Sequence, residues 1–235
     1  MNQTRALCEF LTALTPQNVG ESNLLDLRYK TLDWLGCTIA ALDQPCAAGS
    51  RALAEREGGT PLASGVGIGQ KISAQQAAFY NGIISHALEY DDTNKIAITH
   101  PGAPVIAACL ALAETRNLSF LDYAMGVTVG YEAMIRLGGA LNPDHYEFWH
   151  TTGTCGTFAA AACARLLGLD AEGMERALGI ASTMASGLVY VFGTDAKLVT
   201  VGNAARNGIV AAELAEQGFT APPDAFAAPK GYARA

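Results

Sequence analysis

The sequence predicts an all-α fold that forms a single domain over residues 1–235. Apolar residues recur every three or four positions along most of the chain, a spacing typical of helices that pack on a core. Sustained alternation of apolar and polar residues, which indicates strands, does not occur. Half of the residues are hydrophobic and only 16% are charged, so a chain of this length can bury a substantial core.

In the first half of the chain, one helix is expected over residues 23–42, where apolar positions recur at three and four. Ser73 followed by Gln76 predicts a capping box that opens a helix through residues 77–88 and brings His86 to its end. Residues 60–67 suggest a short extended segment. The glycine-rich run at 65–69 lacks a surrounding βαβ unit, so we interpret it as a flexible connection and not as a nucleotide site.

In the second half, an apolar helix is expected after residues 99–104 and up to about Asn117, and Ser119 with Asp122 caps another through residues 123–141. Further helices are predicted over residues 156–169, near 174–187 and near 202–217. Residues 219–235 then pass through proline turns without an obvious terminal element, so the chain is expected to be interrupted there.

Composition argues against several classes of partner. A formal net charge of −7 disfavours nucleic acid and anionic membranes. The six cysteines form no CxxC pair and no zinc-site spacing, so reduced, buried thiols are expected. The N-terminus lacks the features of a signal peptide, and His and Pro interrupt the longest apolar runs. The expectation is a soluble, cytoplasmic protein.

The most distinctive stretch is residues 81–102, which concentrates polar groups in an otherwise apolar chain. His86, Glu89, Asp91 and Asp92 lie at a predicted helix C-terminus, where the helix dipole disfavours carboxylates, and His100 lies in a turn before Pro101. Carboxylates in this unfavourable position indicate either a functional site or buried partners that stabilise them. The structural alternative is a helix end capped by the Asp pair, with His86 satisfied in the core. A metal site is a further alternative, although the spacing matches no common ligand motif.

Two other segments carry candidate site residues. His150 precedes a helix start rich in Gly and Thr, where backbone N–H groups could hold a carboxylate, or where the same residues could simply cap the helix. Cys155 lacks the local signature of a nucleophile. Lys197 is isolated in an uncharged stretch after a glycine-containing turn, where its ammonium could meet an anion.

Taken together, five motifs resemble the MmgE/PrpD family in order and spacing. They are NGIISHALEYDDT, THPG, GYEAMIRLG, WHTTGTCGTFAAAACARLLGLD and AKLVTVGNAARNGIVAAELAEQGFTAP. The resemblance implies a largely helical main domain, a separate α+β lid domain, a homodimer and cofactor-free, metal-free chemistry on small di- or tricarboxylates. Because family chains are about twice as long, this chain is expected to lack the lid and the C-terminal helices.

Carried over by motif, the resemblance assigns Glu89, Thr93, His100, His150 and Lys197 to the site. The full predicted set of catalytic residues is His100, His150, Lys197, Glu89, Asp91 and Asp92, and the predicted substrate-binding residues are Thr93, Thr151, Gly153 and Lys197. The chain departs from the family at Glu89, where Asp is common, at Asn94 or Lys95, where a His is common, and at Thr200, which replaces a His. These departures leave the substrate open.

The family's reactions share proton transfer at a carbon next to a carboxylate. Lys197 and the helix start after His150 could hold carboxylates, while His100 or His150 moves the proton. Asp91, Asp92 or Glu89 could orient an imidazole. The first hypothesis is therefore a lyase resembling 2-methylcitrate dehydratase, with a cis-aconitate decarboxylase-like or iminodisuccinate epimerase-like enzyme as alternatives. The second is a non-catalytic helical module that needs a separately encoded lid polypeptide and exposes apolar surface where the lid docks.

Overall fold

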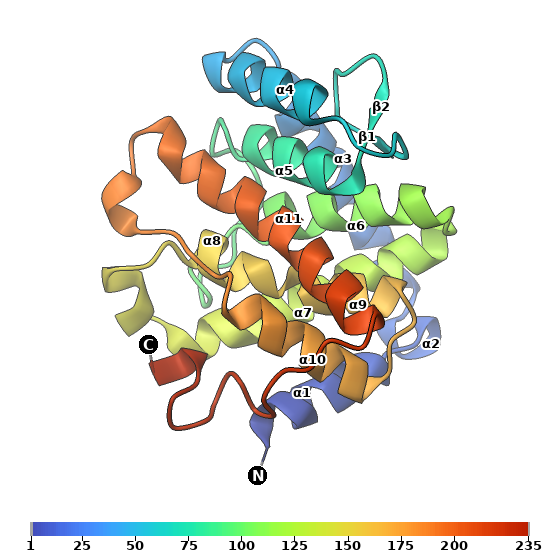
Figure 1. The fold of residues 1–235 in the computed structure, drawn as a ribbon, viewed down its shortest axis with the longest axis vertical. Helices are drawn as coiled ribbons and strands as arrows, with labels where there is room; N and C mark the ends of the chain where they lie inside the picture. Colours follow the sequence, from blue (N-terminus) through green and yellow to red (C-terminus); the bar gives the residue numbers. More distant parts are fainter. Residues whose placement is uncertain (1, 235) are drawn as a thin grey trace.

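The computed structural model describes residues 2–234 and confirms the all-α class. Three helices form the centre: α5 (Ala74–Ser85), α6 (Gly102–Arg116) and α11 (Asp195–Glu216). Figure 1 shows α11 running diagonally across the molecule, with α5 on one side and α10 (Ala171–Ser182) on the other. Nearly every residue of α5 and most of α6 are buried, because other helices surround them.

The crossing of α5 and α11 depends on two glycines. A β-carbon on Gly82 would lie 3.0 Å from the α-carbon of Gly202, and one on Gly202 would lie 2.5 Å from the carbonyl oxygen of Phe79. The two backbones therefore touch, which only residues without a side chain permit. This contact holds the first turn of α11 close to the end of α5, where the polar stretch begins.

The remaining helices enclose this centre. On one side lie α7 (Phe120–Leu141), α8 (Thr151–Gly156) and α9 (Ala160–Leu166), with a 3₁₀ turn, η2 (Thr157–Ala159), joining α8 to α9. On the other side lie α3 (Glu21–Ala40) and α4 (Pro45–Glu57). Helix α1 (Gln3–Thr12) packs on α10 and α7, and α2 (Pro16–Val19) leads into α3. Within residues 2–234, no helix combines the length and apolar character needed to cross a bilayer.

Strands are confined to one small hairpin among the described residues. β1 (Ala63–Ser64) pairs antiparallel with β2 (Lys71–Ile72). The extended segment expected at residues 60–67 is thus a strand at two residues only, and its partner strand was not anticipated. The glycine-rich run at 65–69 connects the two strands, as expected. The amide and hydroxyl of Ser64 donate to the Glu114 carboxylate, which fastens the hairpin to the end of α6.

The predicted caps are largely confirmed. Ser119 and Asp122 form a reciprocal capping box at the start of α7. Ser73 accepts a hydrogen bond from the Gln76 amide, but the return bond is missing, so that cap is only half of the predicted box. Asn117 ends α6 in the left-handed conformation.

Several helix boundaries differ from those expected. The helix expected at 202–217 begins at Asp195, because Thr194 adopts the extended N-cap conformation and Asp195 favours a first turn electrostatically. The helix expected at 174–187 ends at Ser182, and the one expected at 156–169 is divided by η2. Helices α1, α2 and α4 were not individually predicted.

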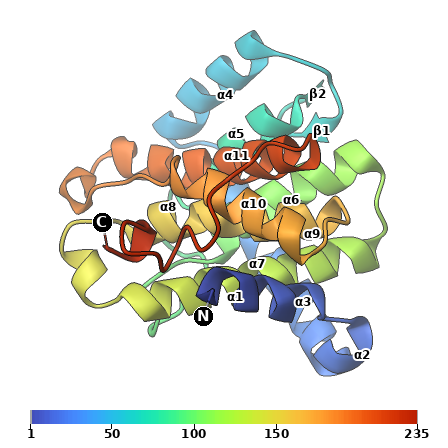
Figure 2. The ribbon, with the colours of Figure 1, turned by 60° about the horizontal axis from the view of Figure 1, so that its bottom comes forward.

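Residues 219–234 pack against the body of the molecule. They run over α10 towards α1 (Figure 2) and end in a short 3₁₀ helix, η4 (Tyr232–Arg234). The Asp224 carboxylate accepts hydrogen bonds from the amide and hydroxyl of Thr4, and the Tyr232 ring lies 5.1 Å from that of Phe158.

All six cysteines are free, and two of them, Cys37 and Cys46, are only partly buried, contrary to the expectation of buried thiols. Four of them are fully buried: Cys8, Cys109, Cys155 and Cys163. Burial raises the pKa of Cys155 to about 12, so this thiol is protonated at neutral pH and unsuited to nucleophilic attack.

Candidate functional site

The loop between α5 and α6 displays the polar stretch in a fixed shape. His86 caps the C-terminus of α5, and two residues of the loop, Glu89 and Ile98, have positive φ angles of 53° and 49°. Asn94 and Thr99 form a β-bridge, and the Asn94 side chain accepts hydrogen bonds from two loop amides. Left-handed backbone at non-glycine residues is uncommon and concentrates at functional sites.

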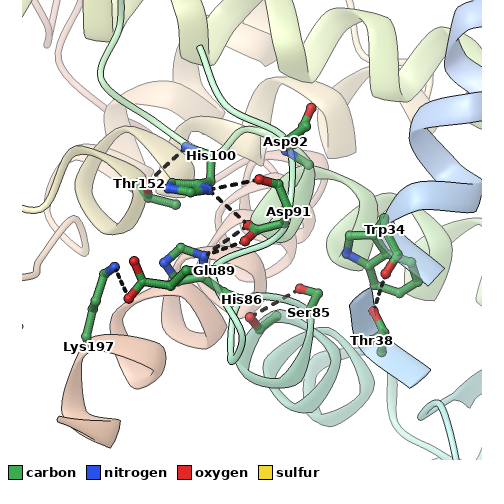
Figure 3. Close-up of polar contacts among 12 residues, drawn as sticks. Trp34, Thr38, Ser85, His86, Glu89, Asp91, Asp92, His100, Thr152 and Lys197 are labelled. Carbon is green, nitrogen blue, oxygen red and sulfur yellow. Dashed lines mark hydrogen bonds and ion pairs between the residues drawn. The ribbon is translucent and has the colours of Figure 1, made fainter. Parts of the chain in front are cut away.

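Asp91 lies between two imidazoles at the base of this loop (Figure 3). Its carboxylate is 2.9 Å from Nδ1 of His86 and 3.4 Å from Nδ1 of His100. Burial would raise the pKa of Asp91, but hydrogen bonds with His100 and His86 outweigh burial and lower the pKa to about 2. Because an ionised carboxylate only accepts hydrogen bonds, Nδ1 of both rings carries a proton. Nε2 of His86 is buried with no partner among the described residues.

His100 presents its other nitrogen towards solvent, since its side chain is 20% exposed. Its backbone amide donates to the hydroxyl of Thr152, and its Nδ1 also lies 3.3 Å from the Asp91 carbonyl oxygen. Burial lowers the pKa of His100, but the hydrogen bond and charge of Asp91 more than compensate and raise it above its usual value. A raised pKa favours the protonated imidazolium near neutral pH.

His150 lies in a contrasting environment at the N-cap of α8. Its Nδ1 is 2.9 Å from the hydroxyl oxygen of Thr200, and that hydroxyl donates to the Lys197 carbonyl, so His150 Nδ1 is the donor. Burial, together with the nearby His86 and Lys197, lowers the pKa of His150 to about 3. His150 is therefore neutral near pH 7, with Nε2 as an acceptor. Thr200, the residue that departs from the family motif, holds this tautomer.

Lys197 lies in the first turn of α11, whereas the helix was expected to begin only near residue 202. Its ammonium is 2.7 Å from the Glu89 carboxylate and 4.8 Å from the centre of the Phe192 ring. The Glu89 side chain is 56% exposed, whereas that of Lys197 is 8% exposed. The hydrogen bond with Lys197 is the main reason that the pKa of Glu89 is lowered. The ion pair closes one side of the site.

These groups surround an open cavity of about 390 Å³. Five predicted residues line it: Glu89, Thr93, His100, His150 and Lys197. Asp91 does not line the cavity but holds the His100 ring from behind. Lining residues that the sequence reasoning did not assign to the site are Asn94, Lys95, Ile98, Thr99, Tyr146 and Thr152. Thr152 follows His150 by two positions, and only the fold brings its hydroxyl to the His100 amide.

Three predicted residues lie away from the cavity. The Asp92 side chain points away from the cavity (Figure 3). Its carboxylate accepts hydrogen bonds from the Gly102 amide and the Tyr131 hydroxyl. Burial raises the pKa of Asp92 despite these bonds. Asp92 thus holds the start of α6.

The other two belong to α8. The Thr151 hydroxyl is buried against the side chain of Asn142, and the Gly153 amide donates to the His150 carbonyl. A β-carbon on Gly153 would lie 2.7 Å from the Thr200 hydroxyl, so this glycine allows α8 and α11 to approach. A substrate-binding role for Thr151 and Gly153 therefore stays a prediction, without contact with the cavity.

The same cluster contains three potential metal-ligand atoms. One ligand atom each from His86, Asp91 and His100 falls within a 4.8 Å span. The carboxylate, however, already lies between the two protonated Nδ1 atoms at hydrogen-bond or ion-pair distances. The Nδ1 atoms of the two rings and the carboxylate are therefore paired with one another, whereas Nε2 of His86 has no partner among the described residues.

Several known proteins are similar to this chain in sequence. A family model described as the MmgE/PrpD N-terminal domain matches residues 5–235. A cis-aconitate decarboxylase-like protein of Aspergillus oryzae, oryM, is 30% identical over 229 residues, covering 93% of this chain and 48% of that protein. The cis-aconitate decarboxylase of Aspergillus terreus is 32% identical over 228 residues, covering 93% and 46%. The human cis-aconitate decarboxylase is 36% identical over 150 residues, covering 61% and 31%. The chain spans about half the length of the Aspergillus relatives that it matches.

Proposed function

The chain belongs to the MmgE/PrpD family, and from this premise we propose that it provides the proton-transfer centre of a lyase for small di- or tricarboxylates. The observation that carries the proposal is the pair of histidines with opposite pKa shifts beside one lysine. His100, with a raised pKa, and His150, with a pKa lowered to about 3, both line the cavity that Lys197 borders. Environments that separate the pKa values of two groups in one site are typical of acid and base pairs.

Lys197 is the proposed anchor for a substrate carboxylate. Its ammonium is nearly buried, and a charge-assisted hydrogen bond there is stronger than one in water. The Glu89 carboxylate already occupies this position, at 2.7 Å, so an incoming carboxylate must displace or share with it. A second lysine, Lys95, also lines the cavity and gives it an excess of positive groups over the single carboxylate of Glu89.

His100 is the proposed acid. With Nδ1 bonded to Asp91, only Nε2 is free to give a proton to a substrate carbon. His150, which is neutral, would accept a hydrogen bond or a proton through its own Nε2. Asp91 is a positioning residue that fixes the tautomer and orientation of His100.

Among the family's reactions we propose decarboxylation, because the relatives named above are cis-aconitate decarboxylases or a decarboxylase-like protein. In this step the bond from the leaving carboxyl group to its neighbouring carbon breaks, and CO₂ departs. The electron pair stays on the substrate carbon framework, where the remaining carboxylates and Lys197 stabilise it. His100 then gives its proton to carbon. Action on 2-methylcitrate or on iminodisuccinate stays a prediction, and the assay below includes both.

We also propose that a further polypeptide segment closes the cavity, either as part of a longer protein or as a separate lid. The support is the apolar surface beside the cavity: Tyr90 and Ile96, which neighbour lining residues, are 81% and 77% exposed. This surface is the feature expected of the non-catalytic alternative too. Only an activity measurement on the chain separates the two.

The decisive experiment follows substrates by proton NMR in D₂O. The purified chain is incubated with cis-aconitate, 2-methylcitrate or iminodisuccinate, alongside His100→Ala and an exposed-lysine control, Lys230→Met. Loss of a carboxyl group from cis-aconitate, abolished in His100→Ala and kept in Lys230→Met, supports the proposal. A folded chain that leaves all three acids unchanged and binds none of them in calorimetry contradicts it, whereas binding without turnover supports the lidless module.

The division between the histidines has its own test in the same samples. The chain has four histidines, so single variants assign each ring C2 proton. His100 is expected to titrate with a midpoint above the usual 6.5, and His150 is expected not to titrate between pH 5 and 8. Titration of His150 in that range would contradict the assignment.

A further inference from the structure

His86 has no role in the proton transfer described above, although it lies among the residues that carry it. Its side chain is fully buried at the end of α5 and does not line the cavity. Its Nδ1 contacts the Asp91 carboxylate, and its Nε2 is buried with no partner among the described residues. Burying a ring nitrogen without a hydrogen bond destabilises a fold, so an apolar side chain would suit a purely packing role better. The contact with Asp91 is therefore where the polar character of His86 acts.

Asp91 bonds more closely to His86 than to His100, although Figure 3 shows both rings directed at the same carboxylate. Nδ1 of His86 lies 3.1 Å from one carboxylate oxygen and 2.9 Å from the other. Nδ1 of His100 lies 3.4 Å from the second oxygen and 3.3 Å from the Asp91 carbonyl oxygen, so its proton is shared between two acceptors. The stronger of the two hydrogen bonds to the carboxylate thus belongs to a ring that does not reach the cavity.

Neighbouring rings fix the orientation of His86. Its ring centre lies 4.6 Å from that of His100, in an edge-to-face arrangement, and 5.7 Å from that of His150, nearly stacked at an angle of 23°. Close packing of this kind limits rotation about the side-chain bonds, because the ring has no empty space to turn into. Nδ1 of His86 therefore stays directed at the Asp91 carboxylate.

The charged and titratable groups around His86 come from the loop and from three helices. The loop contributes its carboxylates and one histidine, the start of α8 and the first turn of α11 contribute one basic group each, and α3 contributes a thiol on the side of Asp91: Glu89, Asp91, His100, His150, Lys197 and Cys37. Among the carboxylates of residues 2–234, that of Asp91 is the one within 4.0 Å of a His86 nitrogen. Asp91 is thus the group on which His86 acts directly.

We propose that His86 is a positioning residue that competes with His100 for the charge of Asp91, and that this competition keeps His100 able to release its proton. The catalytic part rests on the proposed function of His100 as the acid, whereas the effect on His100 itself does not. A carboxylate that is shared between two N–H donors stabilises each imidazolium less than a carboxylate with a single partner.

The consequence for His100 has a definite sign. Without the N–H donor of His86, Asp91 would bond to His100 alone, and the pKa of His100, which Asp91 already raises, would rise further. An acid whose pKa lies far above the working pH gives up its proton more slowly, so turnover would fall. His86 therefore limits the effect of Asp91, which orients His100 but would otherwise hold its proton too tightly.

Two substitutions separate the N–H donor of His86 from the rest of its ring. His86→Asn keeps a donor at the place of Nδ1, since the amide nitrogen is bonded to Cγ as Nδ1 is, whereas His86→Leu removes the donor. In NMR titrations of the ring C2 protons, the His100 midpoint is expected to rise by about 0.5–1 pH unit in His86→Leu and to stay within about 0.3 unit in His86→Asn. Ser85→Ala, which removes a neighbouring hydroxyl bonded to the Gly82 carbonyl, is the matched control and should leave the midpoint unchanged.

Turnover gives a second readout, which depends on the proposed function. With cis-aconitate at pH 7, His86→Leu is expected to lower kcat by about three- to tenfold and to leave KM within about twofold, because His86 does not line the cavity. His86→Asn is expected to restore kcat. If the unmodified chain is inactive but the His100 midpoint shifts as expected, the proposed function fails and the role of His86 stands.

A measurement on the unmodified chain covers the case in which His86→Leu does not fold. Because the shorter of two charge-assisted hydrogen bonds is the stronger, the Nδ1 proton of His86 should resonate further downfield than that of His100. A His100 proton that lies further downfield overturns the proposal. So does a folded His86→Leu variant whose His100 midpoint is unchanged or lower, and so does an equal change in His86→Leu and His86→Asn, which would assign the effect to the shape of the ring.

Discussion

Replacing Asp91 by Asn should destabilise the protein in a way that reveals how this carboxylate is held. The substitution keeps the shape of the side chain but removes the charge between His86 and His100. An amide offers one acceptor where the carboxylate offered two, and its NH₂ group would face the proton on one of the imidazoles. One ring must therefore change tautomer or lose its partner.

The size of the effect follows from the shifted pKa. A fall from the usual 3.8 to about 2 corresponds, at 1.36 kcal/mol per pKa unit, to about 2.4 kcal/mol of stabilisation of the ionised form. Because the folded-state pKa is depressed, this stability is fully present above the unfolded-state value near pH 4 and is lost as the pH falls through about 2. At pH 7, Asp91→Asn should thus lower the free energy of unfolding by about 2–3 kcal/mol and the Tm by about 5–10 °C.

The assay is urea unfolding followed by circular dichroism at pH 7 and at pH 3, with protein concentration held constant. At pH 3 the charge of Asp91 contributes only about half of its value at pH 7, so the gap between the two proteins should narrow to about 1 kcal/mol. Asp43→Asn, which alters an exposed carboxylate, serves as the control and should change stability by less than about 0.5 kcal/mol.

Two results would refute the reasoning. Equal stability of Asp91→Asn and the unmodified protein at pH 7 would mean that the ionised carboxylate makes no net contribution to the free energy of unfolding. A deficit that stays constant from pH 7 to pH 3 would mean that lost packing, and not lost charge, destabilises the variant.

Three other predictions concern the cavity and the helix crossing. Lys197→Met should weaken calorimetric binding of cis-aconitate by roughly 10- to 100-fold, because a charged hydrogen bond is lost, while Lys230→Met should bind normally; equal binding by both variants would remove Lys197 from the site. Glu89→Gln should tighten the same binding by roughly two- to fivefold, the range expected for freeing a partly exposed ion pair, and weaker binding would show that Glu89 assists the ligand instead of competing with it. Gly202→Ala should lower the free energy of unfolding by about 1–3 kcal/mol, since its β-carbon would lie 2.5 Å from a carbonyl oxygen of α5. In contrast, Gly49→Ala, in a helix with open space around it, should raise that free energy by about 0.5–1 kcal/mol; a tolerated Gly202→Ala would mean that the two helices can separate without loss.

Much of the fold was predictable because local signals and the folded state agree. The Ser119 and Asp122 capping box, the end of α6 near Asn117 and the placement of His86 at the end of α5 all depend on residues within four positions of one another. The start of α11 was missed by seven residues. The stretch before Gly202 has weak apolar periodicity, and its helical form depends on packing against α5 and α8.

In the site, too, short motifs identified the candidate residues, whereas the folded loop decided where their side chains point. Sequence motifs identified Glu89, His100, His150 and Lys197 as candidates, because their residue types and order resemble those of the family. They could not distinguish Asp91 from Asp92, since adjacent residues in a loop turn to opposite sides. The backbone of the loop aims Asp91 at two imidazoles and Asp92 at the start of α6.

The amino-acid order alone was sufficient for the helical class, the family and the identity of the ionisable groups, because these depend on periodicity and on motifs within short segments. The raised pKa of His100 is set by the hydrogen bond and charge of Asp91, which outweigh burial, and the lowered pKa of His150 is set by burial and by the nearby His86 and Lys197. The hydroxyl of Thr200, which fixes the tautomer of His150, lies 50 positions from it in sequence. The inner and outer faces of α3 read alike in sequence, since both are apolar. Only packing of the other helices decided which face is buried and which remains exposed.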